Sequence, residues 1–416
     1  RGEINYDQFI DMVASSAPSP GHCNTMGTAT SMNSLAESLG MSLPGCAAIP
    51  APYRERSQMA YDTGYRSVNL VIEDIKPSDI MTMDAFQNAI VTASAIGAST
   101  NAPPHIIAIA KQLDLDLNLE HWEKWGEKIP LLVNLQPAGE YLGEGYFNAG
   151  GVPAVMKELL DNNKLASKAL TVNGKTVKEN LSNVNCKDRK VIYSYSAPLK
   201  ENAGFLVLRS NFFDTAIMKI SVVSKEFNER YLLDEKKPME FTARAIVFDG
   251  PEHYHNEINN PDLNIDENCI LMIRGCGPIG YPGAAEVVNM QPPDYLLKKG
   301  ITSLPCLGDG RQSGTSESPS ILNVSPEAAA GGGLAIIKNN DLIKVDLNNK
   351  RVDLILDDLE IKSRSNDIKF EYPRNQTPWQ ELAREYTGQL GDGACLDLKE
   401  KYINVAESKG IPRDNH

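Results

Sequence analysis

Apolar residues in the first half of the chain recur mainly at helical spacing. One stripe ends at Gly40 and comprises Met32, Leu35, Ala36 and Leu39; another ends at Gly97 and comprises Phe86, Ala89, Ile90 and Ala93. Asn24 or Thr25 is expected to cap the first helix, and Thr82 or Asp84 the second. Further helices are expected at 104–113 and 155–160, with short strands at 67–72 and 129–135. The mixture predicts an α/β domain.

The pattern changes after a polar stretch at residues 173–190. Short apolar runs, separated by turns rich in Gly, Pro and Asn, predict strands at 205–208, 217–223, 241–248, 269–273, 334–337, 342–345 and 352–356. A helix is expected at 377–386. The second half is therefore β-rich, as in a barrel or a sandwich. We predict a domain boundary near residue 203, with one domain over 1–202 and the other over 203–416.

Composition narrows the classes of function. The 416 residues include 41 Lys and Arg against 54 Asp and Glu, a net charge of −13, and 42% are hydrophobic. Such a chain can bury a core, and it lacks the basic surface that nucleic acids and anionic membranes require. No apolar run approaches the roughly 20 residues of a membrane span. Seven cysteines without a CxxC motif favour a reducing compartment over a disulfide framework.

Three segments carry residue types suited to chemistry. Cys23 precedes an expected helix start, which stabilises a thiolate, although a free cysteine in a turn explains the position equally well. Glu286 ends a glycine-rich loop that begins at Arg274, where it either binds a hard cation or simply starts a helix. Ser313 lies among small residues at 308–316, either as an exposed nucleophile or base, or in an ordinary surface turn.

Together these segments resemble the dihydroxy-acid dehydratase / phosphogluconate dehydratase family, and most closely its sugar-acid branch, the pentonate (xylonate and arabinonate) dehydratases. The matching motifs occur in the family's order around Cys23, at 97–102, around Glu286, and at 308–320, 325–329 and 375–379. Residues 22–27 and 311–316 favour the sugar-acid branch. The resemblance implies an α/β N-terminal domain followed by a β-barrel C-terminal domain.

The resemblance also implies roles for individual residues. Cys23 matches the last of three cysteines that hold an iron–sulfur cluster, for which a two-iron form is favoured over a four-iron form. Glu286 matches a carboxylate ligand of Mg²⁺, and Ser313 matches the serine that removes the C2 proton as an alkoxide. The implied substrate-binding residues are Ser99, Thr100, Thr315 and the C-terminal His416.

These residue types suit the dehydration of a pentonate or hexonate to a 2-keto-3-deoxy acid. Cluster iron acts as a Lewis acid on the leaving hydroxyl, and Mg²⁺ stabilises the charge of the developing enolate. A serine is too weak a base by itself, so Ser313 requires the cation bound by Glu286. The alternatives are dihydroxy-acid dehydratase activity in branched-chain amino-acid synthesis, and a non-catalytic truncated remnant that only oligomerises.

The family extends upstream of the position that matches Arg1, and that part carries the other cluster cysteines and Mg²⁺ ligands. We therefore expect the α/β domain to be incomplete, and this chain alone to bind no stoichiometric cluster. The expected partner is a small sugar acid, with neither nucleic acid nor membrane involved. A homo-oligomer, either a dimer or a tetramer, is expected in the cytoplasm, or in mitochondria if a transit peptide has been lost.

Overall fold

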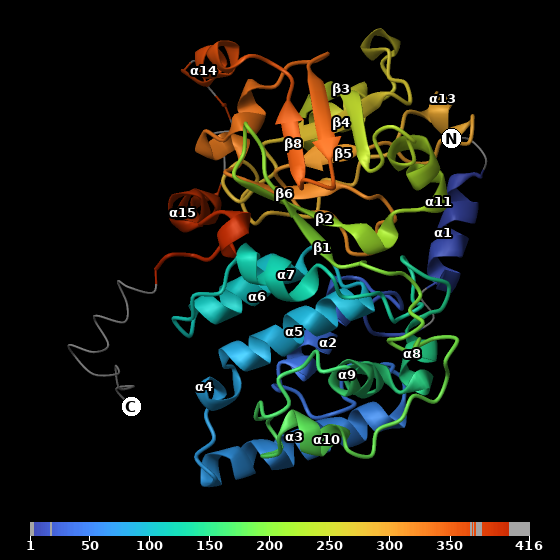
Figure 1. The fold of residues 1–416 in the computed structure, drawn as a ribbon, viewed down its shortest axis with the longest axis vertical. Helices are drawn as coiled ribbons and strands as arrows, with labels where there is room; N and C mark the ends of the chain where they lie inside the picture. The colour runs from blue at the N-terminus through green and yellow to red at the C-terminus, as the bar shows by residue number, and fades with distance from the viewer. Residues whose placement is uncertain (1–3, 17–18, 367, 369, 372–376, 399–416) are drawn as a thin grey trace, which may run out of the picture.

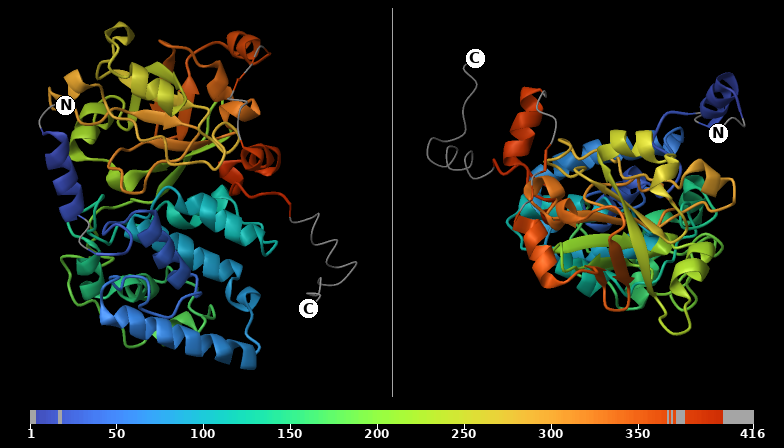
Figure 2. Two further views of the ribbon diagram at one scale, coloured as in Figure 1. Left: turned by 180° about the vertical axis from the view of Figure 1, so that it is seen from behind. Right: turned by 90° about the horizontal axis from the view of Figure 1, so that it is seen from above.

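A computed structural model describes residues 4–16, 19–366, 368, 370–371 and 377–398. Helices and strands separate along the chain, with helices α2 to α10 in one half of the molecule and the sheet in the other (Figures 1 and 2). The helices of the first half are α1 (Tyr6–Ser16), α2 (Thr28–Ser38), α3 (Arg54–Ile72), α4 (Pro77–Ile80), α5 (Met83–Ile96), α6 (Ala102–Lys111), α7 (Leu119–Gly126), α8 (Gly143–Ala149), α9 (Gly151–Asp161) and α10 (Val177–Leu181).

Helix α5 is the centre of the first half, since every residue from Ala85 to Ile96 except Gln87 is buried. It packs against α2, α7 and α9, and Phe86 and Ile90 are fully buried. Thr82 is its N-cap, and Gly97 ends it in the left-handed conformation with φ of 64°, as predicted. The N-cap of α2 is Gly27 and not Asn24 or Thr25, so that helix begins later than predicted.

Two of the predicted strands in this half are not formed as strands. Residues 67–72 belong to α3, so that prediction was wrong: Val68, Leu70 and Ile72 alternate only over a short window, whereas Met59, Arg66 and Leu70 are the less exposed residues at helical spacing. The segment 129–135 is extended but makes only isolated bridges, including Leu131 with Lys200 and Val133 with Ile192. The described part of this half is thus mainly helical, with extended segments between the helices.

The second half forms one mixed sheet of eight strands in the order β1-β2-β6-β5-β4-β3-β7-β8. The strands are β1 (Phe205–Leu208), β2 (Thr215–Lys219), β3 (Glu240–Asp249), β4 (Cys269–Arg274), β5 (Cys306–Gly308), β6 (Ile321–Ser325), β7 (Leu342–Asp346) and β8 (Arg351–Leu354). The two edges meet where Arg209, after β1, donates to the carbonyl of Lys350 and accepts from the amide of Val352. The sheet is therefore a nearly closed barrel, which confirms that prediction.

Further elements surround the barrel: α11 (Lys225–Phe227), α12 (Gly250–Glu257), α13 (Asp294–Leu297), α14 (Asp358–Asn366) and α15 (Pro378–Tyr386). Helix α15 confirms the helix expected at 377–386. The strand predicted at 334–337 was wrong, since Gly333–Ile336 is a 3₁₀ helix. A Cβ on Gly333 would lie 1.8 Å from the carbonyl oxygen of Phe212, so this backbone approach requires glycine. Strand β2 ends at Lys219, earlier than predicted, and a 3₁₀ turn follows it.

Helix α7 joins the helical half to the barrel. The rings of Trp122 on α7 and Phe205 on β1 meet edge to face at 5.4 Å. Lys350, in the turn between β7 and β8, forms salt bridges with Glu123 and Glu127 at 2.6 Å each. The last helix of the first half ends at Leu181 and the first strand begins at Phe205; the boundary near residue 203 stays a prediction. No helix in the described ranges is long and apolar enough to cross a membrane.

A buried carboxylate in α2 makes stability depend on pH. Glu37 accepts hydrogen bonds from the backbone amides of Gly45 and Ala47 at 2.6 and 2.8 Å, yet burial raises its pKa from 4.5 to about 7. The stability gained by protonation is complete below pH 4.5 and is lost as pH rises through 7. We expect the free energy of unfolding to fall by roughly 3 kcal/mol over that window. Urea unfolding of Glu37→Gln should lack this slope; an unchanged slope would assign it to other groups.

Candidate active site

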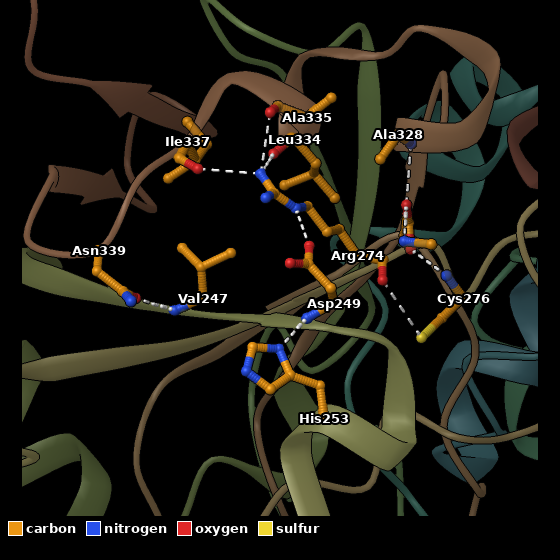
Figure 3. A network of polar contacts seen from close by, with 12 residues as sticks. Val247, Asp249, His253, Arg274, Cys276, Ala328, Leu334, Ala335, Ile337 and Asn339 are labelled. Carbon is orange, nitrogen blue, oxygen red and sulfur yellow. Dashed lines mark hydrogen bonds and ion pairs between the residues drawn. The ribbon is translucent and has the colours of Figure 1, made fainter. Parts of the chain in front are cut away.

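The glycine-rich loop after β4 is anchored at its start by Arg274. Its guanidinium donates to the carbonyls of Leu334, Ala335 and Ile337 at 2.9–3.1 Å, and its Nε pairs with Asp249 at 2.6 Å (Figure 3). The exposed His253, on α12, accepts from the amide of Asp249. Arg274 thus connects the end of β4 to the turn that precedes β7.

Two fully buried carboxylates hold the rest of this loop. Asp309, after β5, accepts from the amides of Gly275, Cys276 and Ala328 at 2.9 Å each. Glu327 accepts from the amides of Ile279 and Gly280. Burial raises the pKa of both groups, and the backbone donors oppose that shift. The loop that ends at Glu286 is therefore held in one conformation from the barrel side.

Glu286 reaches the helical half through two donors. The hydroxyl of Thr28, the first residue of α2, donates to Oε1 at 3.2 Å, and the side-chain amide of Asn101 donates to the same oxygen. Thr28 also shares a hydrogen bond of 2.9 Å with Ser99. His105 and Arg311 lie near this carboxylate: burial and the charge of Arg311 lower the pKa of His105, and the charge of Glu286 opposes both effects.

Ser313 lies beside the same group of residues. Its Oγ is 2.8 Å from Oγ1 of Thr315, and its backbone amide donates to Asn289 at 3.3 Å. A Cβ on Gly314 would lie 2.6 Å from the side chain of Ser99, so the serine loop packs directly on the residues between α5 and α6. Only glycine permits that approach, which brings the predicted Ser99 and Ser313 into one site.

Cys23 and Thr315 both lie close to Gly27. A Cβ on Gly27 would lie 3.0 Å from the Cys23 sulfur and 3.1 Å from a methyl carbon of Thr315. The thiol is exposed and unpaired, and it is 3.7 Å from the hydroxyl of Thr25. It lines a cavity of about 790 Å³ whose walls include His22 and Arg56. The structure therefore brings Cys23, Glu286, Ser313 and Thr315 together from separate parts of the sequence.

Comparison with known proteins identifies the family of the chain. Models of the dihydroxy-acid/6-phosphogluconate dehydratase family match the chain over residues 1–180 for the N-terminal domain and 190–394 for the C-terminal domain. The chain belongs to this dehydratase family.

Within the family, the chain is more similar to two relatives that are named as sugar-acid dehydratases than to one that is named as a dihydroxy-acid dehydratase. The chain is 56% identical to a D-xylonate dehydratase of Caulobacter vibrioides and 41% identical to an L-arabinonate dehydratase of Rhizobium leguminosarum bv. trifolii, covering 100% of this chain and 69% of each relative. It is 37% identical to a dihydroxy-acid dehydratase of Acetivibrio thermocellus, covering 96% of this chain and 70% of that protein.

Dehydratases of this family use iron–sulfur clusters and Mg²⁺. The donor chemistry here fits both: Cys23 is an accessible thiol, and Glu286 is a carboxylate beside the buried amide oxygen of Asn101, which has no hydrogen-bond partner among the described residues. Within the described ranges, no group of three or more His, Cys, Asp or Glu side chains is arranged so that it could hold a metal ion.

The other predicted substrate-binding residues are Ser99, Thr100 and His416. Ser99 and Thr100 are buried, Ser99 fully, and the carbonyl of Thr100 accepts from Asn323 at 3.2 Å. Their role in substrate binding stays a prediction. His416 lies outside the described residues. Sequence reasoning missed Thr28 and Asn101, although both belong to segments that carry the family resemblance; a threonine at a helix start and an asparagine before a helix look like ordinary capping residues.

Proposed function

We propose that this dehydratase converts a pentonate or hexonate to a 2-keto-3-deoxy acid. The observation that supports this most is the convergence of Ser313, Glu286 and Cys23, which come from two loops of the barrel half and from the segment before α2. The higher identity to a D-xylonate dehydratase than to a dihydroxy-acid dehydratase supports the sugar-acid substrate.

In the proposed mechanism, Ser313 takes the proton from C2 of the substrate. Ser313 is half-buried, and its Oγ shares a hydrogen bond with the hydroxyl of Thr315. Thr315 is proposed to orient this oxygen and to bind the substrate beside it. The buried contact of Gly314 with Ser99 fixes the backbone on which Ser313 stands. Ser99, Thr100 and the C-terminal His416 are proposed to complete the substrate pocket.

Cys23 is proposed to hold the iron–sulfur cluster, in a two-iron form, and Glu286 is proposed to hold Mg²⁺. When bound, the cluster supplies a Lewis acid for the C3 hydroxyl, and Mg²⁺ supplies positive charge that lowers the pKa of the serine and stabilises the enolate. All seven cysteines are unpaired in the structure, in keeping with the proposed cytoplasmic location. A homo-oligomer is also proposed.

Turnover of a panel of sugar acids tests the proposal. When the chain is produced together with the upstream part that the family carries, and is reconstituted with iron, sulfide and Mg²⁺, D-xylonate, L-arabinonate and a hexonate should yield 2-keto-3-deoxy acids, and a branched 2,3-dihydroxy acid should react far more slowly. Preference for the branched acid would favour the amino-acid biosynthetic activity. Iron analysis of that same preparation separates the third alternative: if it bound no stoichiometric iron and turned over none of these acids, it would be a non-catalytic remnant.

A further inference from the structure

Asn101 lies where three segments of the site meet. It occupies the N-cap position of α6, yet its side chain makes no capping hydrogen bond, and it is completely buried. Its Nδ2 group contacts Oε1 of Glu286, the hydroxyl of Thr28 at 2.9 Å and the carbonyl of Gln312 at 3.1 Å. A primary amide has two hydrogens, so it serves two of these acceptors at a time, and the carboxylate is the strongest of them.

The other end of this side chain differs from that of another buried asparagine, Asn88. Asn88, equally buried in α5, satisfies both ends on one residue, because its Nδ2 donates to the carbonyl of Ala166 and its Oδ1 accepts from the amide of Ala166. Oδ1 of Asn101 is buried and has no hydrogen-bond partner among the described residues. An unsatisfied buried acceptor lowers stability, so its presence indicates that the donor side of Asn101 is needed for another reason.

Both donors to Glu286 use the same carboxylate oxygen. Asn101 and Thr28 donate to Oε1, and within the described ranges no hydrogen bond reaches Oε2. A glutamate at the end of a glycine-rich loop otherwise has several rotamers available, and fixing one of them has an entropic cost at the moment of binding. Two donors from the helical half fix that rotamer in advance and leave Oε2 for a ligand.

We propose that Asn101 is a positioning residue for Glu286, which it holds across the contact between the helical half and the barrel. Its amide fixes Oε1 so that Oε2 is the oxygen that binds the ligand. This inference rests on the proposed function in one respect, namely that Glu286 binds a ligand. The hydrogen bond from Asn101 to Glu286 can be tested without measuring turnover.

A double variant in which Asn101 and Glu286 exchange their donor and acceptor roles tests the hydrogen bond between them. Asn101→Asp removes the donor and places two carboxylates together, so the midpoint of urea unfolding at pH 8 should fall. Glu286→Gln added to it restores a donor on the opposite side, and the double variant should recover at least about half of that loss. If the shifts of the two single variants simply add, Asn101 does not act on Glu286 and the proposal is overturned.

Asn88→Asp is the matched control, because it buries the same new carboxylate away from the site. Its loss of stability should be unaffected by Glu286→Gln. Should Asn101→Asp fail to fold, Thr28→Val removes the other donor to Oε1, and its cost should shrink in the Glu286→Gln background. The same additive result there would count against the proposal.

Turnover separates positioning from general destabilisation. With the pentonate that the wild type uses best, Asn101→Asp should lower kcat at least about tenfold, whereas Asn88→Asp should leave it unchanged. An unchanged kcat in Asn101→Asp would overturn the positioning role. If the wild type turns over no sugar acid, the proposed function fails, but the unfolding experiment still decides whether Asn101 holds Glu286.

Discussion

Replacement of Ser313 by alanine should reduce turnover of a pentonate by about 10³-fold or more, with little change in the unfolding midpoint. The Ser313 side chain is half-buried, and among the described residues its Oγ interacts with Thr315, through the side-chain contact of 2.8 Å and the backbone amide at 3.3 Å. Its loss therefore removes the proposed base without leaving a buried group unpaired. Product formation under saturating substrate measures kcat directly.

Two further variants define what the loss means. Thr315→Val retains the serine but removes the hydroxyl that orients it, so it should affect kcat less than Ser313→Ala does. Ser316 lies in the same loop, and in the part of the chain that the structure describes its hydroxyl accepts one bond of 3.3 Å, from the amide of Ser318. Ser316→Ala should therefore behave like the wild type. Near-normal turnover by Ser313→Ala would exclude the serine as the base.

Elements whose apolar pattern matches their burial could be predicted from the sequence. The stripes of α2 and α5 and the apolar runs of β1, β3, β7 and β8 face the cores directly, so spacing alone indicates the element. Strands β5 and β6 were missed because they are short and contain Gly308, Asn323 and Ser325, residues that neighbouring strands and loops place in the barrel. The helical state of 67–72 was missed because the alternation of Val68, Leu70 and Ile72 covers only the last turns of the longer helix α3.

The site was predictable for a different reason. Cys23, Glu286 and Ser313 have ambiguous local patterns, and only the family resemblance assigns them roles. Their closeness depends on contacts between residues far apart in the chain, such as Thr28 with Glu286 and Asn101 with Glu286. Periodicity carries no information about such pairs, so the two donors that hold Glu286 became evident only from the folded chain.

Replacement of Asp309 by alanine should lower the free energy of unfolding by roughly 3 kcal/mol or more, because it leaves three buried backbone amides without an acceptor. Two of those amides, from Gly275 and Cys276, begin the loop that carries Glu286. The third, from Ala328, belongs to the turn after β6. Turnover should therefore fall together with stability, since the loop loses its fixed conformation.

The geometry also predicts a graded series. Oδ2 of Asp309 accepts from Gly275 and Ala328, and Oδ1 accepts from Cys276, so Asp309→Asn can retain two of these three hydrogen bonds and should lie between the wild type and Asp309→Ala. Asp116→Ala, at an exposed position, should leave the urea midpoint unchanged. Equal midpoints for Asp309→Ala and Asp116→Ala would show that the carboxylate of Asp309 does not hold the loop, and its fixed conformation would then depend on Glu327 and Arg274.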